Sequence, residues 1–102
     1  MEPELKVILH APSPAALQRA RNNALNLRNG MPAAEVRIIA NAQAVEAALD
    51  VAHERLDAST WICPVSLERL GRGNREPLQV LGGSAVLEIA RMQAAGWVYI
   101  RA

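Results

Sequence analysis

The chain contains a single cysteine, Cys63, and this scarcity excludes an internal disulfide framework. A free thiol fits a reducing compartment, so we expect a cytoplasmic protein. No excess of one charge is present either: 11 basic and 10 acidic residues argue against general nucleic-acid binding. No apolar run approaches the roughly 18–20 residues that cross a bilayer, so we expect no membrane association. Residues 1–6 are acidic and charged, unlike a secretory signal.

What is present is an alternation of short apolar runs with amphipathic stretches along a chain of 102 residues. The length suits one domain, and no internal repeat or linker divides it. Strands are expected near residues 4–10, 35–40, 60–63, 78–81 and 97–101. The alternation predicts right-handed crossovers, and therefore a single three-layer α/β/α sandwich, residues 1–102, with a mostly parallel five-stranded sheet.

The first two helices are expected from capping residues and from apolar periodicity. Ser13 reads as the N-cap of the first helix, and Gly30 as its C-terminal stop. Asn41 is expected to cap the second helix, whose apolar stripe begins at Val45 and extends as far as Leu56.

Proline and glycine bound the other two helices. Pro64 begins a short third helix that Gly71 ends. The turn of residues 82–84 opens a fourth helix, which Gly96 closes.

The strand-to-helix junctions carry the polar candidates for a site. Ligands of parallel sheets bind outside the carboxyl ends of the strands, and these ends share one edge of the sheet. The junction residues are His10, Asn41, Cys63 and the turn of Gly82, Gly83 and Ser84. We therefore expect them to lie near one another.

Cys63 is the expected N-cap of the third helix. The free N–H groups and the positive end of the helix dipole favour a thiolate at this position. Ser66, three residues on, can donate a hydroxyl hydrogen bond toward the sulfur. This C-x-x-S arrangement suits a nucleophilic or persulfide-carrying cysteine. Cysteine is also among the most buried residue types, so simple packing is the alternative.

Segments along nearly the whole chain resemble the DsrE/DsrF-like sulfur-relay family. The similar segments are the first strand ending at His10, residues 23–27, residues 35–41, the cysteine turn 62–67 with Gly71, and residues 84–89 and 93–100. The resemblance implies a three-layer α/β fold, assembly as a homotrimer or homohexamer, and a persulfide carried on Cys63. Pro64 and Val65 depart from the glycine and the polar residue that are common in the family at these positions.

His10, Asn23 and the turn of residues 82–84 are weaker candidates for a polar pocket. His10 can act as a base or as a partner of the Cys63 thiolate, although a structural histidine is the more frequent case. Asn23 lies beside the apolar stripe of its helix and can line a pocket. The glycine turn before Ser84 can seat an anion, with a tight turn as the alternative.

The remaining histidines and charged residues do not have the spacing of a metal site or of a catalytic site. Two histidines and one cysteine without clustered spacing predict no metal site, and we expect no cofactor. His53 is expected on a solvated flank of the second helix. Arg69, Arg72 and Arg75 surround one loop, which is typical of a solvated basic face that can steer an acidic partner.

Three hypotheses follow from these residues. In the first, Cys63 accepts sulfane sulfur from a donor protein and hands it to an acceptor protein, without acting as a free-standing multiple-turnover enzyme. In the second, a binding or regulatory module holds a small anion or nucleotide at the strand ends, and Cys63 only packs. In the third, the chain is a structural subunit of an oligomer, as Trp61, Trp97 and Tyr99 near sheet edges also suggest.

Overall fold

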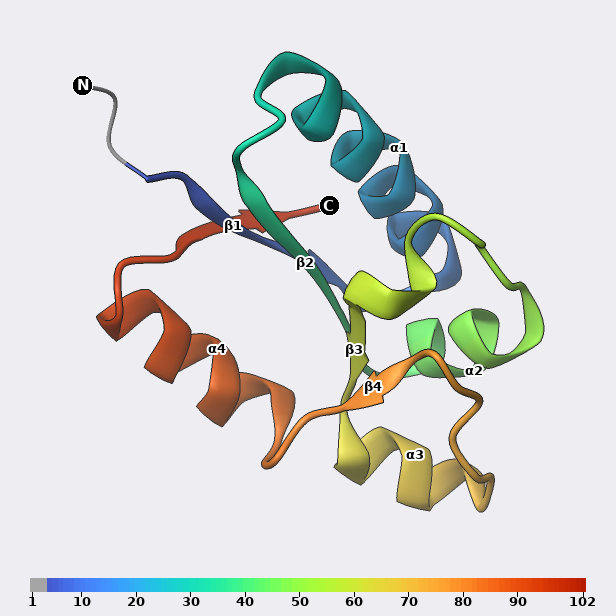
Figure 1. The fold of residues 1–102 in the computed structure, drawn as a ribbon. Helices are drawn as coiled ribbons and strands as arrows, with labels where there is room; N and C mark the ends of the chain where they lie inside the picture. Colours follow the sequence, from blue (N-terminus) through green and yellow to red (C-terminus); the bar gives the residue numbers. More distant parts are fainter. Residues whose placement is uncertain (1–3) are drawn as a thin grey trace.

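The computed structural model describes residues 4–102, in which strands and helices alternate (Figure 1). The strands are β1 (Lys6–Ala11), β2 (Glu35–Ala40), β3 (Thr60–Ile62), β4 (Gln79–Val80) and β5 (Val98–Arg101). The helices are α1 (Pro14–Gly30), α2 (Gln43–Asp50), α3 (Pro64–Leu70) and α4 (Ala85–Ala94), with a short 3-10 helix η1 (Asp57–Ser59) before β3. All five strands are parallel, in the order β4-β3-β2-β1-β5, which confirms the predicted α/β class.

The strand order explains how the helices divide between the two faces of the sheet. From β1 to β4 the chain steps in one direction across the sheet, so right-handed crossovers place α1, α2 and α3 on the same face. The connection from β4 to β5 reverses that direction and places α4 on the opposite face, where it lies apart from the other helices (Figure 1).

Two apolar clusters fill the space on either side of the sheet. The larger cluster joins alternate residues of β1 and β2, such as Leu9 and Ile38, to α1 and α2. The smaller cluster lies beneath α4 and consists of Ile8, Ile39, Cys63, Leu81, Ala85 and Ile89. Because successive side chains of a strand point to opposite faces, neighbouring residues of one strand belong to different clusters. Cys63 therefore faces α4.

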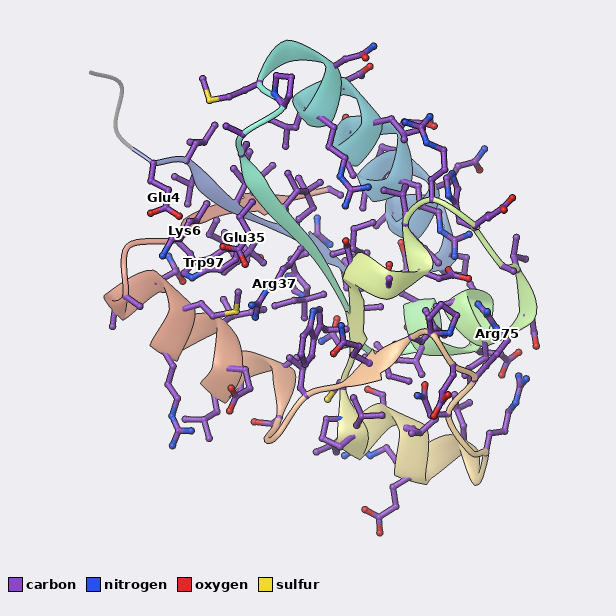
Figure 2. All side chains as sticks on the ribbon, viewed as in Figure 1. Glu4, Lys6, Glu35, Arg37, Arg75 and Trp97 are labelled. Carbon is purple, nitrogen blue, oxygen red and sulfur yellow. The ribbon has the colours of Figure 1, made fainter. Side chains whose placement is uncertain are left out.

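Beyond α4, the same sheet face is covered by long side chains stacked on tryptophan. The Cζ atom of Arg37 lies 5.0 Å from the ring centre of Trp61 and 4.9 Å from that of Trp97. Lys6 also lies over Trp97, and Glu35 pairs with Arg37 at 3.4 Å. Figure 2 shows Lys6, Glu35, Arg37 and Trp97 gathered beside α4. Cation–π stacking of this kind lets charged residues cover apolar ring surface while their charged ends stay wet.

The predicted boundaries of the first, third and fourth helices agree closely with the structure. The Ser13 hydroxyl accepts a hydrogen bond from the Ala16 N–H, as expected of an N-cap. Gly71 and Gly96 both adopt positive φ after their helices. Gly30 is the last residue of α1, and Met31 is its C-cap.

The prediction for the second helix was wrong at both ends. Ala42, and not Asn41, is the N-cap of α2, and the helix ends at Asp50. Leu56 is fully buried, but it lies just before η1 and outside the helix. Its spacing from Val45 matched a helical period only by coincidence, since burial of Leu56 comes from the turn into η1.

Ala42 adopts a backbone conformation that alanine rarely takes, with φ 50° and ψ −135°. Its N–H donates to the Ser66 hydroxyl at 2.9 Å. We expect Ala42→Gly to raise the free energy of unfolding by about 0.5–1 kcal/mol, because relief of strain exceeds the added entropy of the unfolded chain. Urea denaturation measures this. Ala47→Gly within α2 is the matched control, and it should lower the same quantity by about 1 kcal/mol.

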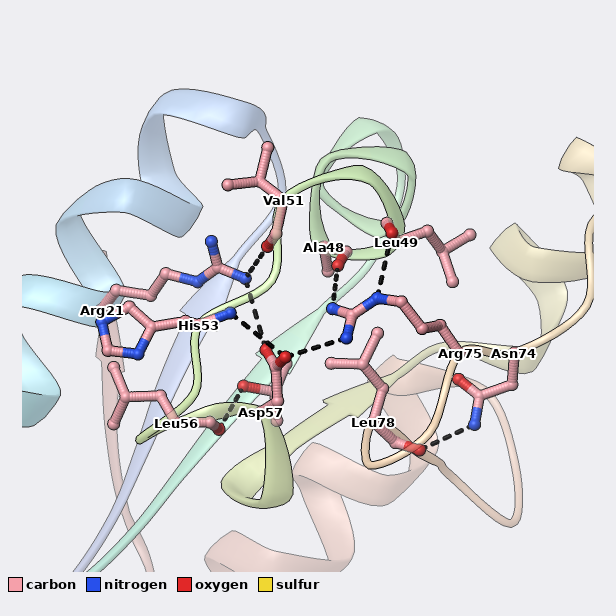
Figure 3. Close-up of polar contacts among 11 residues, drawn as sticks. Arg21, Ala48, Leu49, Val51, His53, Leu56, Asp57, Asn74, Arg75 and Leu78 are labelled. Carbon is pink, nitrogen blue, oxygen red and sulfur yellow. Dashed lines mark hydrogen bonds and ion pairs between the residues drawn. The ribbon is translucent and has the colours of Figure 1, made fainter.

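A buried ionic cluster fastens the loops that surround α2 (Figure 3). Asp57 is almost fully buried, and its carboxylate lies 2.9 Å from Arg75 and 3.7 Å from Arg21. The His53 N–H also donates to this carboxylate at 3.1 Å. The cluster thus joins α1, η1 and the loop before β4.

Arg75 also completes the C-terminal end of α2. Its guanidinium donates to the carbonyls of Ala48 at 2.7 Å and Leu49 at 3.0 Å. These carbonyls lie in the last turn of the helix, where hydrogen-bond partners are otherwise missing. The prediction of a solvated basic face therefore fails for Arg75, although Arg72 does form a surface pair with Asp50.

His53 also differs from its prediction. It follows the end of α2, and its ring Nδ1 is buried with no hydrogen-bond partner among the described residues. The early end of α2 is the reason, because His53 no longer lies on a helix flank.

No helix within residues 4–102 combines the length and the apolar character needed to cross a membrane.

Candidate functional site

Cys63 lies directly after β3, where the strand turns into α3. Its N–H donates to the carbonyl of Ala40 on the neighbouring strand, which holds the turn against the sheet. Pro64 occupies the first helical position, and Cys63 is the N-cap, as predicted. The side chain points beneath α4 and is only 5% exposed.

Burial and the neighbouring helix starts act in opposite directions on the pKa of the Cys63 thiol. Burial raises the pKa of the Cys63 thiol. The N–H groups of Ser66, Ala85 and Val65 and the hydroxyl of Ser66 lower it further than burial raises it, so the pKa lies below its ordinary value. Val65 and Ser66 belong to the first turn of α3, whereas Ala85 begins α4. The sulfur therefore lies where the positive ends of two helices meet.

Ser66 connects this sulfur to the start of α2. Its Oγ accepts a hydrogen bond from the Ala42 N–H at 2.9 Å, which leaves the hydroxyl hydrogen free to donate to the sulfur. The predicted C-x-x-S contact stays a prediction, and the hydrogen bond from Ala42 leaves the Ser66 hydroxyl able to make it.

His10 is held in a chain of three polar side chains next to the cysteine turn. Its Nε2 lies 2.9 Å from Asn41 Oδ1, and its Nδ1 lies 2.6 Å from the Tyr99 hydroxyl. Because Oδ1 can only accept, Nε2 donates to Asn41, and in the neutral imidazole Nδ1 then accepts from the Tyr99 hydroxyl. The three side chains come from β1, β5 and the end of β2.

Two cavities flank the cysteine, and Cys63 itself lines neither of them. One, of about 190 Å³, is walled by His10, Asn41, Tyr99 and by Val86 and Gln93 of α4. The other, of about 640 Å³, is a groove between α2 and α3 that includes Ser66 and Ala42. Ala85, which packs in the same apolar cluster as Cys63, lines the first cavity, and Ser66 of the α3 first turn lines the second.

The structure brings most, but not all, of the predicted site residues together. His10 and Asn41 are hydrogen-bonded to each other, and Ser66 lies at the sulfur. The turn of Gly82, Gly83 and Ser84 leads to Ala85, although the Ser84 side chain makes no capping hydrogen bond. Asn23 is not part of this group, because it lies on α1 on the opposite face of the sheet from Cys63.

Sequence reasoning missed Tyr99 and Ala85 as members of the site. Tyr99 reaches His10 only because β5 crosses back to pair with β1, which the sequence does not reveal. Sequence patterns could not single out the Ala85 N–H, because every residue except proline has a backbone N–H group. A tyrosine on the last strand, on the same face as His10, was the one available signal.

The fold and the site together define a parallel α/β protein with one buried thiol at a strand end. A scan of the chain against models of known protein families finds no match, and no curated protein is significantly similar to it in sequence.

Proposed function

We propose that this protein is a sulfur-relay protein of the DsrE/DsrF-like type, which carries sulfane sulfur as a persulfide on Cys63. The observation that supports this proposal most is the position of Cys63 as the N-cap of α3 and beside Ala85 at the start of α4, where N–H groups and the Ser66 hydroxyl lower the pKa of the thiol despite burial. The same donors stabilise the negative charge of either a thiolate or a persulfide.

The chemistry balances without any further reactant. The Cys63 thiolate attacks the outer sulfur of a donor persulfide, so that a new S–S bond forms on Cys63 and the donor leaves as a thiolate. In the second half of the relay, an acceptor thiolate attacks the outer sulfur and Cys63 departs as the thiolate. Each half is an exchange in which one S–S bond forms and one breaks.

The setting of this relay follows from the resemblance and from the free thiol. A reducing, cytoplasmic location keeps Cys63 reduced between transfers. Donor and acceptor proteins are the partners, and a homotrimer or homohexamer is the assembly that the resemblance implies. We propose neither a metal nor a cofactor, since persulfide exchange needs none.

The test is mass spectrometry after incubation of the reduced protein with a low-molecular-weight persulfide. We expect a mass increase of one sulfur atom, reversed by a thiol reductant and absent from Cys63→Ser. Since Cys63 is the only cysteine, the adduct needs no further assignment. A native protein that gains no sulfur, while the urea-unfolded protein does, would contradict the relay.

One observation favours a second candidate, a small-molecule binding module. Cys63 lines neither cavity, whereas His10, Asn41, Tyr99 and Gln93 all line the cavity of about 190 Å³. In this alternative the polar cavity holds a small anion or nucleotide fragment, and Cys63 only packs. Native mass spectrometry of the purified protein would detect a retained ligand, and His10→Ala should release it.

A further inference from the structure

β5 forms one edge of the sheet, and its apolar side chains are exposed. Val98, Tyr99 and Ile100 are 46%, 37% and 40% exposed. Val98 and Ile100 lie on the face of α1, and Tyr99 lies on the face of α4. Within residues 4–102 no strand pairs with the outer side of β5. Apolar edge strands are usually covered, because they otherwise pair with other chains.

The backbone of β5 presents two residues to its outer side. The Ala102 N–H donates to the His10 carbonyl at 2.9 Å, so Ala102 turns its backbone groups toward β1. Alternate residues of a strand turn these groups to opposite sides, so Val98 and Ile100 also face β1. The N–H and C=O groups of Tyr99 and Arg101 therefore face outward, where another strand can reach them.

We propose that β5 pairs with β5 of a second copy of this chain, antiparallel and around a two-fold axis at Tyr99. In this register Tyr99 exchanges both backbone hydrogen bonds with Tyr99 of the partner subunit. Val98 then lies opposite Ile100 of the partner subunit, and the symmetry repeats this β-branched pair on the other side of the axis. Both side chains of each pair are exposed in the single chain and lie on the same face.

The symmetry of this register favours a second copy as the occupant, because each strand supplies both members of every cross-strand pair. Arg101 is the only charged residue of β5, and the two-fold axis places it opposite Trp97 of the partner subunit. Trp97 lies against the last turn of α4, since its N–H donates to the Met92 carbonyl. Arg101 therefore lies near the C-terminal end of α4 of the second copy, where the helix dipole is negative, and near the Lys6, Arg37 and Glu35 side chains gathered at that copy's Trp97.

Val86 widens the apolar surface beside the strand. It is 76% exposed and shares the wall of the smaller cavity with Tyr99. The surface of Val86 matters because stable interfaces bury about 1,200–2,000 Å². Two four-residue strands alone bury less than this area. Pairing would also place the cavity of about 190 Å³ of each copy next to the same interface, one on either side. The inference does not depend on the proposed relay, because it uses no property of Cys63.

The first test combines the molar mass in solution with amide hydrogen exchange. We expect light scattering to report an even number of 11.0 kDa chains, as a dimer or a hexamer with two-fold axes, at micromolar concentrations and above. The Tyr99 and Arg101 amides should exchange slowly at high concentration and faster on dilution, whereas the Ile100 amide is protected throughout. A monomer or a trimer would overturn the proposal, as would rapid exchange of the Tyr99 amide at high concentration.

The second test uses one valine from each edge strand. Val98→Lys should shift the protein to monomers, because it buries a charge opposite Ile100 of the partner subunit. Val80→Lys is the matched control, since Val80 is 37% exposed on β4 at the opposite edge. It should leave the molar mass unchanged. The proposal is overturned if both substitutions dissociate the protein equally, or if neither does. Circular dichroism checks that both variants are folded.

Discussion

Asp57→Ala is expected to lower the free energy of unfolding by about 3–5 kcal/mol, the largest effect of any single substitution considered for this chain. The carboxylate is 3% exposed and faces two guanidinium groups, those of Arg21 and Arg75. Its removal leaves the buried Arg21 without a counter-charge. Burial already lowers the pKa of Arg21, which Asp57 offsets by raising it. Urea denaturation at neutral pH measures the change.

The control for this prediction is a carboxylate that also pairs with arginine, but at the surface. Asp50 lies 2.8 Å from Arg72, yet both side chains are largely exposed. Asp50→Ala should change the free energy of unfolding by no more than about 1 kcal/mol. Equal effects of the two substitutions would mean that the Asp57 cluster contributes no more than a surface pair.

The second large effect concerns the pH dependence of Cys63 alkylation. Only the thiolate reacts, so the rate rises with pH through the pKa of the thiol. Because that pKa lies below its ordinary value, the midpoint of the rate should fall below the midpoint measured for the same thiol in the urea-unfolded protein. Cys63→Ser should abolish the reaction, which identifies the reacting atom in this single-cysteine chain. A midpoint at or above the ordinary value would show that burial prevails over the surrounding donors.

Ser66→Ala should raise this midpoint, because it removes one of the donors that stabilise the thiolate. Ser84→Ala is the matched control, since the Ser84 side chain makes no capping hydrogen bond.

The lowered pKa of Cys63 also has a consequence for the stability of the fold. A thiol whose pKa is lower when folded stabilises the fold above its unfolded pKa, and this contribution disappears as pH falls through the folded pKa. The stability of the native chain relative to Cys63→Ser should therefore rise with pH across that window.

Sequence patterns predicted the strands well because burial on both faces produces continuous apolar runs. Residues 35–40 form β2 as expected, and the other strands agree within two residues at each end. The position of Cys63 followed from the same reasoning, since a proline after an apolar run marks where a strand turns into a helix.

The missed features all depend on contacts between distant segments. Arg75 caps α2 from more than 20 residues away, and nothing local distinguishes it from Arg72. Asp57 reads as an ordinary surface acid until two arginines from other elements surround it. Tyr99 joins His10 across 89 positions, through a strand order that periodicity cannot supply.

The strand order also determines when the chain can complete its fold. β1 lies inside the sheet, yet its β5 neighbour pairs Val7 with Val98, 91 positions later along the chain (98 minus 7). Closing so long a loop is entropically costly, so in the isolated chain we expect α4 and β5 to open more readily than the strands β1 to β3. That unit forms the lid of the smaller apolar cluster, which contains Cys63. Detachment of residues 85–102 would therefore uncover the sulfur without breaking the pairing of β1, β2 and β3.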